Sequence, residues 1–308
     1  MTAPPAIGFV GFGEAAFHIS NGLRQSGVSS ITAFDIHTNT PGVGETIRDQ
    51  AAAAGVRLVS SNEELAFAAE MILSTVTADR ALAAAGENAP WLGSHHLYAD
   101  LNSVSPATKQ SVARMIENTG ARFVEIAIMA PVPPKGHHVP MLAGGLYAEE
   151  FISRLAPFGI RAEAVSLEIG TAAATKMFRS IVVKGLEAIL TECLLGAYRY
   201  GADKRVLASL QETYPEMDWT RLANYMVGRV VEHGERRARE MEEVAATLES
   251  IGIEPIMAAA TVRRMDWSKA SGLKAKFPGT PPSGYPEVFQ ALESPTSNPP
   301  AVAAEECL

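Results

Sequence analysis

A glycine-containing segment near the amino terminus has the residue types and spacing of a phosphate-binding turn. The apolar run Ile7–Val10 leads into Gly11-x-Gly13-x-x-Ala16, and a helical pattern follows at once. Gly11 would make the tight turn, Gly13 would let a pyrophosphate approach the backbone, and Ala16 would let the helix pack closely on the strand. The free N–H groups and the positive dipole end of that helix would face the phosphates. An ordinary strand-to-helix turn is the alternative for the glycines alone.

Asp35 points from a phosphate site to a dinucleotide site. It directly follows a second strand-like run, 30–34, and lies about 20 residues after the glycines, which is the spacing expected for an acid that holds an adenosine ribose. Such a carboxylate accepts hydrogen bonds from the ribose 2′-hydroxyl and repels a 2′-phosphate, which favours NAD without excluding NADP. A solvated strand end is the alternative. The predicted cofactor-binding residues of this region are Gly11, Phe12, Gly13, Glu14, Ala15 and Asp35.

The segment 100–106, DLNSVSP, lies at the end of another strand-like run. Ligands of open α/β sheets bind beyond the carboxyl ends of the strands, so Asn102 and Ser103 are placed to exchange hydrogen bonds with a ligand. Ser103 or Ser105 could instead cap the helix that begins at Pro106, a favourable first-turn residue. Both roles are compatible if Ser105 is the cap and Ser103 faces the ligand.

Lys176 stands near the start of a helical run that is rich in small residues, 170–180 (GTAAATKMFRS). Small side chains let another group approach the helix backbone. Lys176 and Ser180 are four residues apart and therefore share a helix face. A lysine in a dry cleft can have its pKa lowered towards neutrality and serve as a general acid or base. A surface lysine is the alternative, and it is the commoner position of any single lysine.

These candidates need a scaffold, and the first half of the chain alternates strand-like and helix-like runs. This alternation predicts an N-terminal α/β Rossmann domain, a doubly wound parallel sheet with helices on both faces. The proline-rich connection 130–140 cannot be a central strand. Strands are predicted at 7–10, 30–35, 56–59, 71–76, 96–101 and 122–129, and helices at 15–26, 46–54, 62–69, 78–86 and 106–119.

Beyond Gly170 the alternation stops and apolar residues recur at helical spacing. A helix over 171–200 would be about 45 Å long, so we expect part of it to pack against a second subunit in a homodimer. Further helices are predicted at 218–234, 235–251 and 255–269. The predicted organisation is a dinucleotide-binding domain over 1–168, an all-α substrate and dimerisation domain over 169–276, and a Pro/Ser-rich tail over 277–308.

Composition narrows the class of protein. The 308-residue chain has a net charge of −8 at pH 7 and no basic run or basic-aromatic patch, which argues against a nucleic-acid partner. Its two cysteines, Cys193 and Cys307, suggest neither a disulfide framework nor a metal site. The amino terminus lacks the basic region of a signal peptide, and charges interrupt the apolar run 181–197. We therefore expect a cytoplasmic protein without a bound metal or a membrane span, whose partner is a small-molecule substrate.

Together these segments resemble the β-hydroxyacid dehydrogenase superfamily, which includes 3-hydroxyisobutyrate and 6-phosphogluconate dehydrogenases. The family's nucleotide motif looks like Gly11-x-Gly13-x-x-Ala16, and its nicotinamide-side motif DSSTIxP is similar to 100–106, which puts Ser103 at the threonine. The family's catalytic motif GxGxxxKxxxN looks like 170–180, so Lys176 falls on the acid–base lysine. The residues 176–180 and 184–187 resemble those of a bacterial subgroup that is labelled 6-phosphogluconate dehydrogenase-like and has a distinct C-terminal domain.

The resemblance implies an NAD(P)-dependent dehydrogenase or reductase that acts on the CH–OH group of a hydroxyacid or a related alcohol or carbonyl compound. Lys176 would take or give the hydroxyl proton, while Ser103, Asn102 and Ser180 would orient the reacting oxygen. Arg239, followed by Glu240-Met241, resembles the basic residue of a later Lys-Asp-Leu motif that reaches towards the cofactor. The residues that complete the predicted cofactor site are Val76, Thr77, Asn102 and Arg239.

Two departures from the family pattern concern the substrate. Ser180 stands in place of the usual asparagine, and the family's substrate loop DAPVSGG becomes EIAIMAP over 125–131. The two glycines that would let a small carboxylate meet backbone N–H groups are absent. Met129 and Ala130 suggest a more apolar substrate pocket that also includes Ser103 and Ser180. The alternatives are an imine reductase, which typically lacks the lysine, and a non-catalytic dinucleotide-binding redox sensor.

Overall fold

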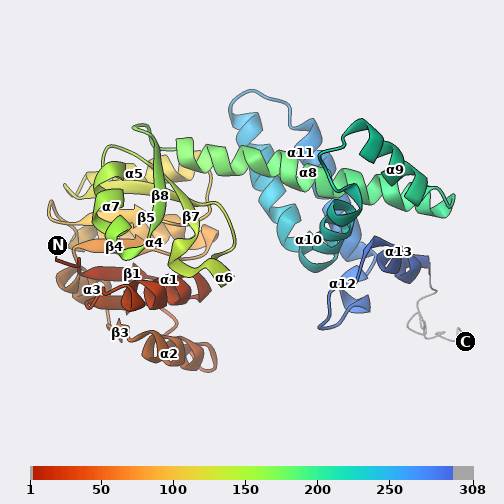
Figure 1. Ribbon diagram of the computed structural model, residues 1–308. Coiled ribbons are helices and arrows are strands. Elements are labelled where there is room, and N and C mark those ends of the chain that lie inside the picture. The colour runs from red at the N-terminus through yellow and green to blue at the C-terminus, as the bar shows by residue number, and fades with distance from the viewer. Residues whose placement is uncertain (1–2, 294–308) are drawn as a thin grey trace, which may run out of the picture. The chain divides into compact units, whose positions relative to one another are not determined.

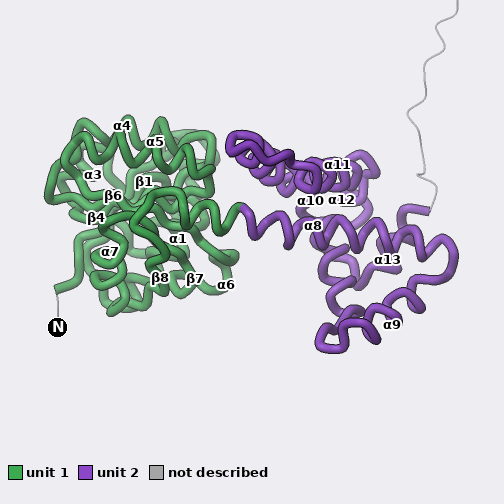
Figure 2. The backbone as a smooth tube through the Cα atoms, turned by 90° about the horizontal axis from the view of Figure 1, so that it is seen from above, with its two compact units in different colours: residues 1–177 green, residues 178–308 purple. Residues whose placement is uncertain are grey.

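The computed structural model describes residues 3–293, and the chain divides after Met177 into two compact units (Figure 2). The first unit contains the sheet, and the second is helical. The division falls inside a long helix, whereas the sequence pattern places the boundary before that helix, at 168/169. The boundary moves because the first residues of α8 contact the sheet unit, while the rest of the helix contacts the helical unit.

One eight-stranded sheet forms the centre of the first unit, with strand order β3-β2-β1-β4-β5-β6-β7-β8 (Figure 1). The strands from β3 to β6 pair in parallel, β7 is antiparallel to β6, and β8 is parallel to β7. The strands are β1 Ile7–Val10, β2 Ile31–Phe34, β3 Arg57–Leu58, β4 Met71–Ser74, β5 Leu97–Asp100, β6 Arg122–Ile128, β7 Pro140–Gly144 and β8 Arg161–Ser166. The sequence pattern predicts the first six but not β7 and β8, because β7 begins at a proline and β8 alternates charge with alanine.

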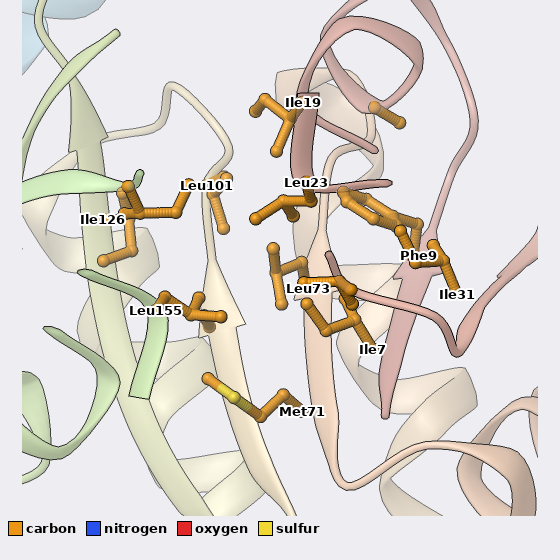
Figure 3. Packing of buried hydrophobic residues seen from close by; sticks show 14 of the residues in the cluster. Ile7, Phe9, Ile19, Leu23, Ile31, Met71, Leu73, Leu101, Ile126 and Leu155 are labelled. Atoms are coloured by element: carbon orange, nitrogen blue, oxygen red, sulfur yellow. The ribbon is translucent and has the colours of Figure 1, made fainter. Parts of the chain in front are cut away.

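Helices cover both faces of this sheet, and each face has its own hydrophobic cluster. The helices of one face are α1 Glu14–Gln25, α2 Val43–Ala54 and α7 Ala148–Leu155. The helices of the other face are α3 Asn62–Ala68, α4 Ala81–Asn88 and α5 Pro106–Glu117. On the first face, Ile19 and Leu23 of α1 pack against Leu73 of the sheet (Figure 3). The predicted doubly wound sheet followed by an α-helical C-terminal region is confirmed.

The second unit is an all-helical bundle. Its core joins the second half of α8 to α10 and to the helices that follow, and it includes Leu194, Trp219 and Phe289. Residues 171–177 of α8 belong to the first unit. The helices are α8 Thr171–Arg199, α9 Asp203–Thr213, α10 Trp219–Ser250, α11 Ile256–Ala270, α12 Leu273–Lys276 and α13 Tyr285–Glu293.

Two predictions about this unit are wrong. The helices predicted at 218–234 and 235–251 form the single helix α10, because Gly234 does not end a helix but lets α11 approach. A Cβ on Gly234 would lie 3.2 Å from the carbonyl oxygen of Met265 and 3.2 Å from Ser268.

The predicted tail begins too early. Its residues 285–293 form α13, whose Tyr285 and Phe289 are buried in the bundle core. The hydroxyl of Tyr285 also donates to Oδ2 of Asp203 at 2.8 Å. The sequence analysis missed this short amphipathic helix because Pro and Ser residues flank it, and its packing against the bundle core identifies it. The rest of the predicted tail, 294–308, lies outside the described residues, as does Cys307.

The connection after β6 contains no strand before β7, as its prolines predict. It forms the short helix α6 Val132–Lys135 and the turn η3 Gly136–His138. The other single-turn 3₁₀ helices of the sheet unit are η1 Ala78–Arg80, η2 Ala89–Trp91 and η4 Ala156–Phe158.

Candidate active site

The glycine turn lies between β1 and α1, at the point where the strand order reverses between β1 and β4. Gly11 has φ +81°, and a Cβ there would lie 2.7 Å from Cγ1 of Val76. Only glycine fits this turn, because the residues after β4 press against it; Thr75 Oγ1 donates to the Gly11 carbonyl at 2.8 Å. This reversal is the place where open α/β sheets bind ligands.

The space beside the turn has the form of a phosphate cradle. Within the described residues, a Cβ built on Gly13 would meet no atom within 4 Å. Gly13 is also the residue before α1 and has no side chain to cap the helix, so the first N–H groups of α1, beginning at exposed Glu14, stay available to a ligand. Phe12 is fully buried under the turn, and Ala15 is half-buried. An anion therefore finds open space, free donors and the positive end of a helix dipole together.

Asp35 follows β2 and holds the glycine turn. Its Oδ2 accepts from the backbone N–H of Phe12 at 2.7 Å, and its Oδ1 accepts from the N–H of His37 at 2.8 Å. Each carboxylate oxygen has a second lone pair, so Asp35 can also accept a hydroxyl hydrogen. The sequence predicts the ribose contact but not this structural hydrogen bond to the turn.

The segment after β5 divides its polar side chains between the interior and the surface. Asn102 is buried, and its Nδ2 donates to Oγ of Ser74 at 2.9 Å, which ties the ends of β4 and β5 together. Ser103 is exposed. Ser105 caps α5 by accepting from the N–H of Thr108 at 3.2 Å, as predicted. The contact of Asn102 with a cofactor stays a prediction; its Oδ1 has no hydrogen-bond partner among residues 3–293.

Lys176 and Ser103 meet although 73 residues separate them in sequence. The Nζ of Lys176 donates to Oγ of Ser103 at 2.6 Å, and both residues belong to the first unit. Lys176 is half-buried and lies about one turn and a half into α8, since the helix begins at Thr171. An amine that contacts an exposed hydroxyl at the carboxyl end of β5 can exchange a proton with a ligand oxygen placed beside both.

Glu125 lies inside β6, within the strand predicted at 122–129, and is completely buried. The segment 125–131, which resembles the family's substrate loop, therefore begins as strand up to Ile128. Its Oε1 accepts from the N–H groups of Gly170 at 2.8 Å and Ala172 at 3.0 Å, at the start of α8. A single acid in the otherwise apolar run FVEIAI is the sequence signal that could have identified it.

Lys109 of α5 is the second buried charge beneath the site. Its Nζ lies 2.6 Å from the carbonyl oxygen of Asp100 and 3.3 Å from Oδ2 of the same residue. Burial lowers the pKa of Lys109, while the carboxylates of Asp100 and Glu125 oppose that shift. No sequence pattern marks this lysine, because it stands at a helix position where a surface lysine is equally common.

The remaining predicted residues of the first unit lie around the same strand ends. Met129 and Ala130 are half-buried directly after β6. β5 and β6 are parallel neighbours, so Ser103 and Met129 both follow carboxyl ends at the same edge of the sheet. Val76 is half-buried and Thr77 exposed after β4.

Ser180 and Arg239 belong to the second unit. Ser180 is half-buried and lies one helical turn after Lys176 in α8. Arg239 of α10 pairs with Glu242 at 2.6 Å and with Asp266 at 3.1 Å, and its side chain is 58% exposed. These ion pairs show what orients Arg239 within the helical bundle, and its cofactor role stays a prediction.

A separate cavity of about 490 Å³ lies among helices α10, α11 and α12 of the second unit. His233 lines it, with Arg229 Nη1 at 2.9 Å and a carboxylate oxygen of Glu232 at 3.3 Å from its Nε2. Burial and Arg229 lower the pKa of His233. The charged lining residues Glu235 and Lys269 are paired with each other, which indicates a solvated ionic surface.

Within the described part of the chain, no helix is both long and apolar enough to span a membrane. The same residues contain no group of three or more His, Cys, Asp or Glu side chains that could hold a metal ion. Cys193 is exposed on α8.

Several proteins are similar to this chain in sequence and fold. A family model described as Domain of unknown function (DUF1932) matches residues 197–268. A conserved hypothetical protein from Sinorhizobium meliloti 1021 is 38% identical, with 94% of this chain and 96% of that chain covered and a TM-score of 0.80. Conserved protein MTH1747, of unknown function and described as structurally similar to 3-hydroxyacid dehydrogenases, is 32% identical, with 87% and 98% covered and a TM-score of 0.75. The chain belongs to the β-hydroxyacid dehydrogenase family.

Solved structures of lower sequence identity are similar to this chain in fold alone. A Mycobacterium tuberculosis 3-hydroxyisobutyrate dehydrogenase solved with L-serine is 15% identical, covers 95% of this chain and 100% of its own, and has a TM-score of 0.74. An imine reductase variant from Myxococcus stipitatus solved with NAD⁺ is 17% identical, with 94% and 99% covered and a TM-score of 0.56. The structural neighbours of this β-hydroxyacid dehydrogenase family member are thus hydroxyacid dehydrogenases and imine reductases.

Proposed function

We propose that this protein is an NAD(P)-dependent oxidoreductase that moves hydride between a nicotinamide cofactor and a hydroxyacid or a related alcohol or carbonyl compound. The observation that carries the proposal is the 2.6 Å contact of Lys176 Nζ with Ser103 Oγ at the carboxyl end of β5. That strand neighbours β4, whose end presses on the glycine turn. Family membership supports the reaction class, and the contact supports the acid–base residues.

The residues of the turn fit a dinucleotide. The open space at Gly13 and the uncapped start of α1 match a pyrophosphate, and Gly11 to Ala15 would hold it. Asp35 would accept from an adenosine ribose hydroxyl, which favours NAD over NADP. Val76, Thr77 and Asn102 would line the path towards the nicotinamide. The cofactor supplies a two-electron hydride acceptor or donor.

Lys176 provides the proton transfer that must accompany hydride transfer. In oxidation, the neutral amine of Lys176 takes the substrate hydroxyl proton as hydride leaves the carbinol carbon, and a carbonyl forms. In reduction, the ammonium returns a proton to the alkoxide oxygen. Ser103 accepts a hydrogen bond from Lys176, so its own hydroxyl hydrogen is free to be donated to the substrate oxygen. The pair thereby orients the oxygen on which charge develops.

Within the first unit, the substrate would meet Met129 and Ala130. Their mostly apolar character supports a substrate with an apolar side chain and no phosphate. We also propose a homodimer, since α8, with 29 residues, is about 44 Å long and exposes Val182 and Ile189. The low cysteine content supports a cytoplasmic location. Sedimentation or light scattering of the purified protein tests the dimer.

A panel of aliphatic and aromatic hydroxyacids, assayed with NAD⁺ and NADP⁺, tests the reaction. Lys176→Ala is expected to lower kcat by about 10²–10⁴-fold, the contribution of a positioned general acid–base, with the Kd for NADH kept. Lys204→Ala, which removes an exposed lysine of α9, is the matched control and should leave kcat unchanged. Turnover by Lys176→Ala at the wild-type rate overturns the acid–base role. Binding of NADH without turnover of hydroxyacids, aldehydes or imines supports a redox sensor instead.

A further inference from the structure

Glu125 joins three elements of the first unit at one buried point. It pairs with Asp100 across β5 and with Gly144 across β7, and it is 0% exposed. Its Oε1 accepts two backbone hydrogen bonds from the first turn of α8, at Gly170 and Ala172. These N–H groups have no partner within their own helix, so a carboxylate from a neighbouring strand serves as the cap.

The surroundings of Glu125 are built to hold the carboxylate in this place. Gly144 leaves the room that its side chain needs, since a Cβ on Gly144 would collide with the Glu125 carboxylate. Lys109 contributes a buried positive charge from α5, paired with Asp100 beside it. The positive dipole end of α8 adds to this compensation. Gln110 Nε2 also donates to the carbonyl of Ile169 at 3.1 Å, directly before the anchored turn.

The same anchor fixes the geometry of the reacting pair. Lys176 follows Ala172 by one helical turn, which is a rise of about 6 Å along α8. Ser103 stands three residues after Asp100, the strand partner of Glu125. The positions of Lys176 and Ser103 therefore depend on two paired residues of neighbouring strands, Glu125 and Asp100. A shift of the Glu125 carboxylate would move Lys176 relative to Ser103.

We propose that Glu125 is the positioning residue of Lys176: by binding the Gly170 and Ala172 N–H groups it holds the first turns of α8 so that Nζ reaches Ser103. Its importance for turnover rests on the proposed function, whereas the anchoring itself does not. Glu125 touches no reacting atom and acts only through the helix.

The test uses the full chain with Glu125→Ala, Glu125→Gln and Gly144→Ala. Glu163→Gln, at an exposed position of β8, is the matched control. Two measurements need no substrate: hydrogen exchange of the Gly170 and Ala172 amides, and the acetylation rate of Lys176 relative to exposed Lys204, both read by mass spectrometry. Glu125→Ala is expected to raise the exchange and change the Lys176 labelling severalfold. Glu125→Gln keeps an oxygen acceptor, so its amide exchange and its Lys176 labelling should lie between those of wild type and Glu125→Ala. If Glu125→Ala does not fold, Glu125→Gln provides the test.

Activity provides the third measurement. A displacement of about 1 Å costs on the order of 100-fold in rate, so Glu125→Ala should lose kcat on that scale while the Kd for NADH is kept. Gly144→Ala should reproduce the loss, and Glu163→Gln should change none of the three. Unchanged exchange and labelling in Glu125→Ala overturn the inference, and so does a wild-type kcat in a variant whose α8 amides have been released. If the wild type has no turnover but Glu125→Ala still changes the exchange and the labelling, the proposed function is overturned and the anchoring role of Glu125 is upheld.

Discussion

Asp35 Oδ2 accepts the N–H of Phe12 at 2.7 Å, so the acid after β2 holds the glycine turn after β1. The Asp35 side chain therefore stabilises the shape of the phosphate cradle and is also predicted to determine which cofactor binds. A nucleotide that reached Asp35 would bind to a turn whose geometry the same carboxylate maintains.

Replacing Asp35 should separate these two roles. Asp35→Asn keeps an oxygen acceptor and removes the charge that repels a 2′-phosphate, so the ratio of the NADPH and NADH dissociation constants should fall by about tenfold, or ~1.4 kcal/mol. Asp35→Ala also leaves the Phe12 N–H without its acceptor, which should cost a further ~1–3 kcal/mol of unfolding free energy. Isothermal titration and urea unfolding measure the two effects. An unchanged cofactor ratio in Asp35→Asn would remove Asp35 from the cofactor site.

The two glycines of the turn should respond oppositely to a methyl group. Gly11→Ala places a Cβ 2.7 Å from Val76 at φ +81°, so it should destabilise the protein by about 1–3 kcal/mol. Gly13→Ala has open space for its methyl group and should leave the unfolding free energy within about 0.5 kcal/mol of wild type. The added methyl group should nevertheless weaken NADH binding, because it occupies the space predicted for the pyrophosphate. Tight NADH binding by Gly13→Ala would place the cofactor elsewhere.

Ser103 and Lys176 should behave as one unit in kinetics. Ser103→Ala removes the hydroxyl that Lys176 contacts, and we expect kcat to fall by about 10²-fold, with a smaller further loss when Lys176→Ala is added. The double-mutant cycle measures the coupling directly. Ser105→Ala is the comparison, because this serine caps α5 and should cost about 1 kcal/mol of stability with little effect on kcat. Fully additive losses in the cycle would argue against a shared role.

His96 should make the protein less stable in acid. The ring accepts from the N–H of Gly93 at its Nδ1 and lies 2.9 Å from the Ala66 carbonyl at its Nε2, so the folded state holds the neutral ring. Burial lowers the pKa of His96 below its ordinary 6.5. The unfolded chain therefore binds more protons just below pH 6.5, and the unfolding free energy should fall as the pH drops from 6.5 through the folded pKa.

Urea unfolding at several pH values between 5 and 8 measures this dependence. One extra proton in the unfolded state changes the slope by at most about 1.4 kcal/mol per pH unit. His96→Gln should lose that part of the slope, although it is less stable at pH 8. His37→Gln, which replaces an exposed histidine that is not among the groups acting on His96, should keep the wild-type slope. An identical slope in His96→Gln and wild type would assign the acid sensitivity to other groups.

Much of this protein follows from local patterns in its sequence. Gly11 marks the turn because its φ of +81° and the 2.7 Å approach of Val76 exclude a side chain, and Gly13 leaves open space beside it. The alternation of strand and helix predicts the doubly wound sheet, because buried parallel strands are short apolar runs between amphipathic helices. The cap at Ser105 is equally local, since the residue before a proline favours the extended backbone that an N-cap serine adopts.

The tertiary structure decided what depends on distant residues. Lys176 meets Ser103 across 73 residues only because α8 begins where Glu125 of β6 binds it. Burial and pairing of Glu125 and Lys109 depend on strand order, which no local pattern specifies. The continuity of α10 through Gly234 and the packing of Phe289 were likewise set by neighbouring helices. A sequence records which side chains can do chemistry, while the fold fixes the distances at which they do it.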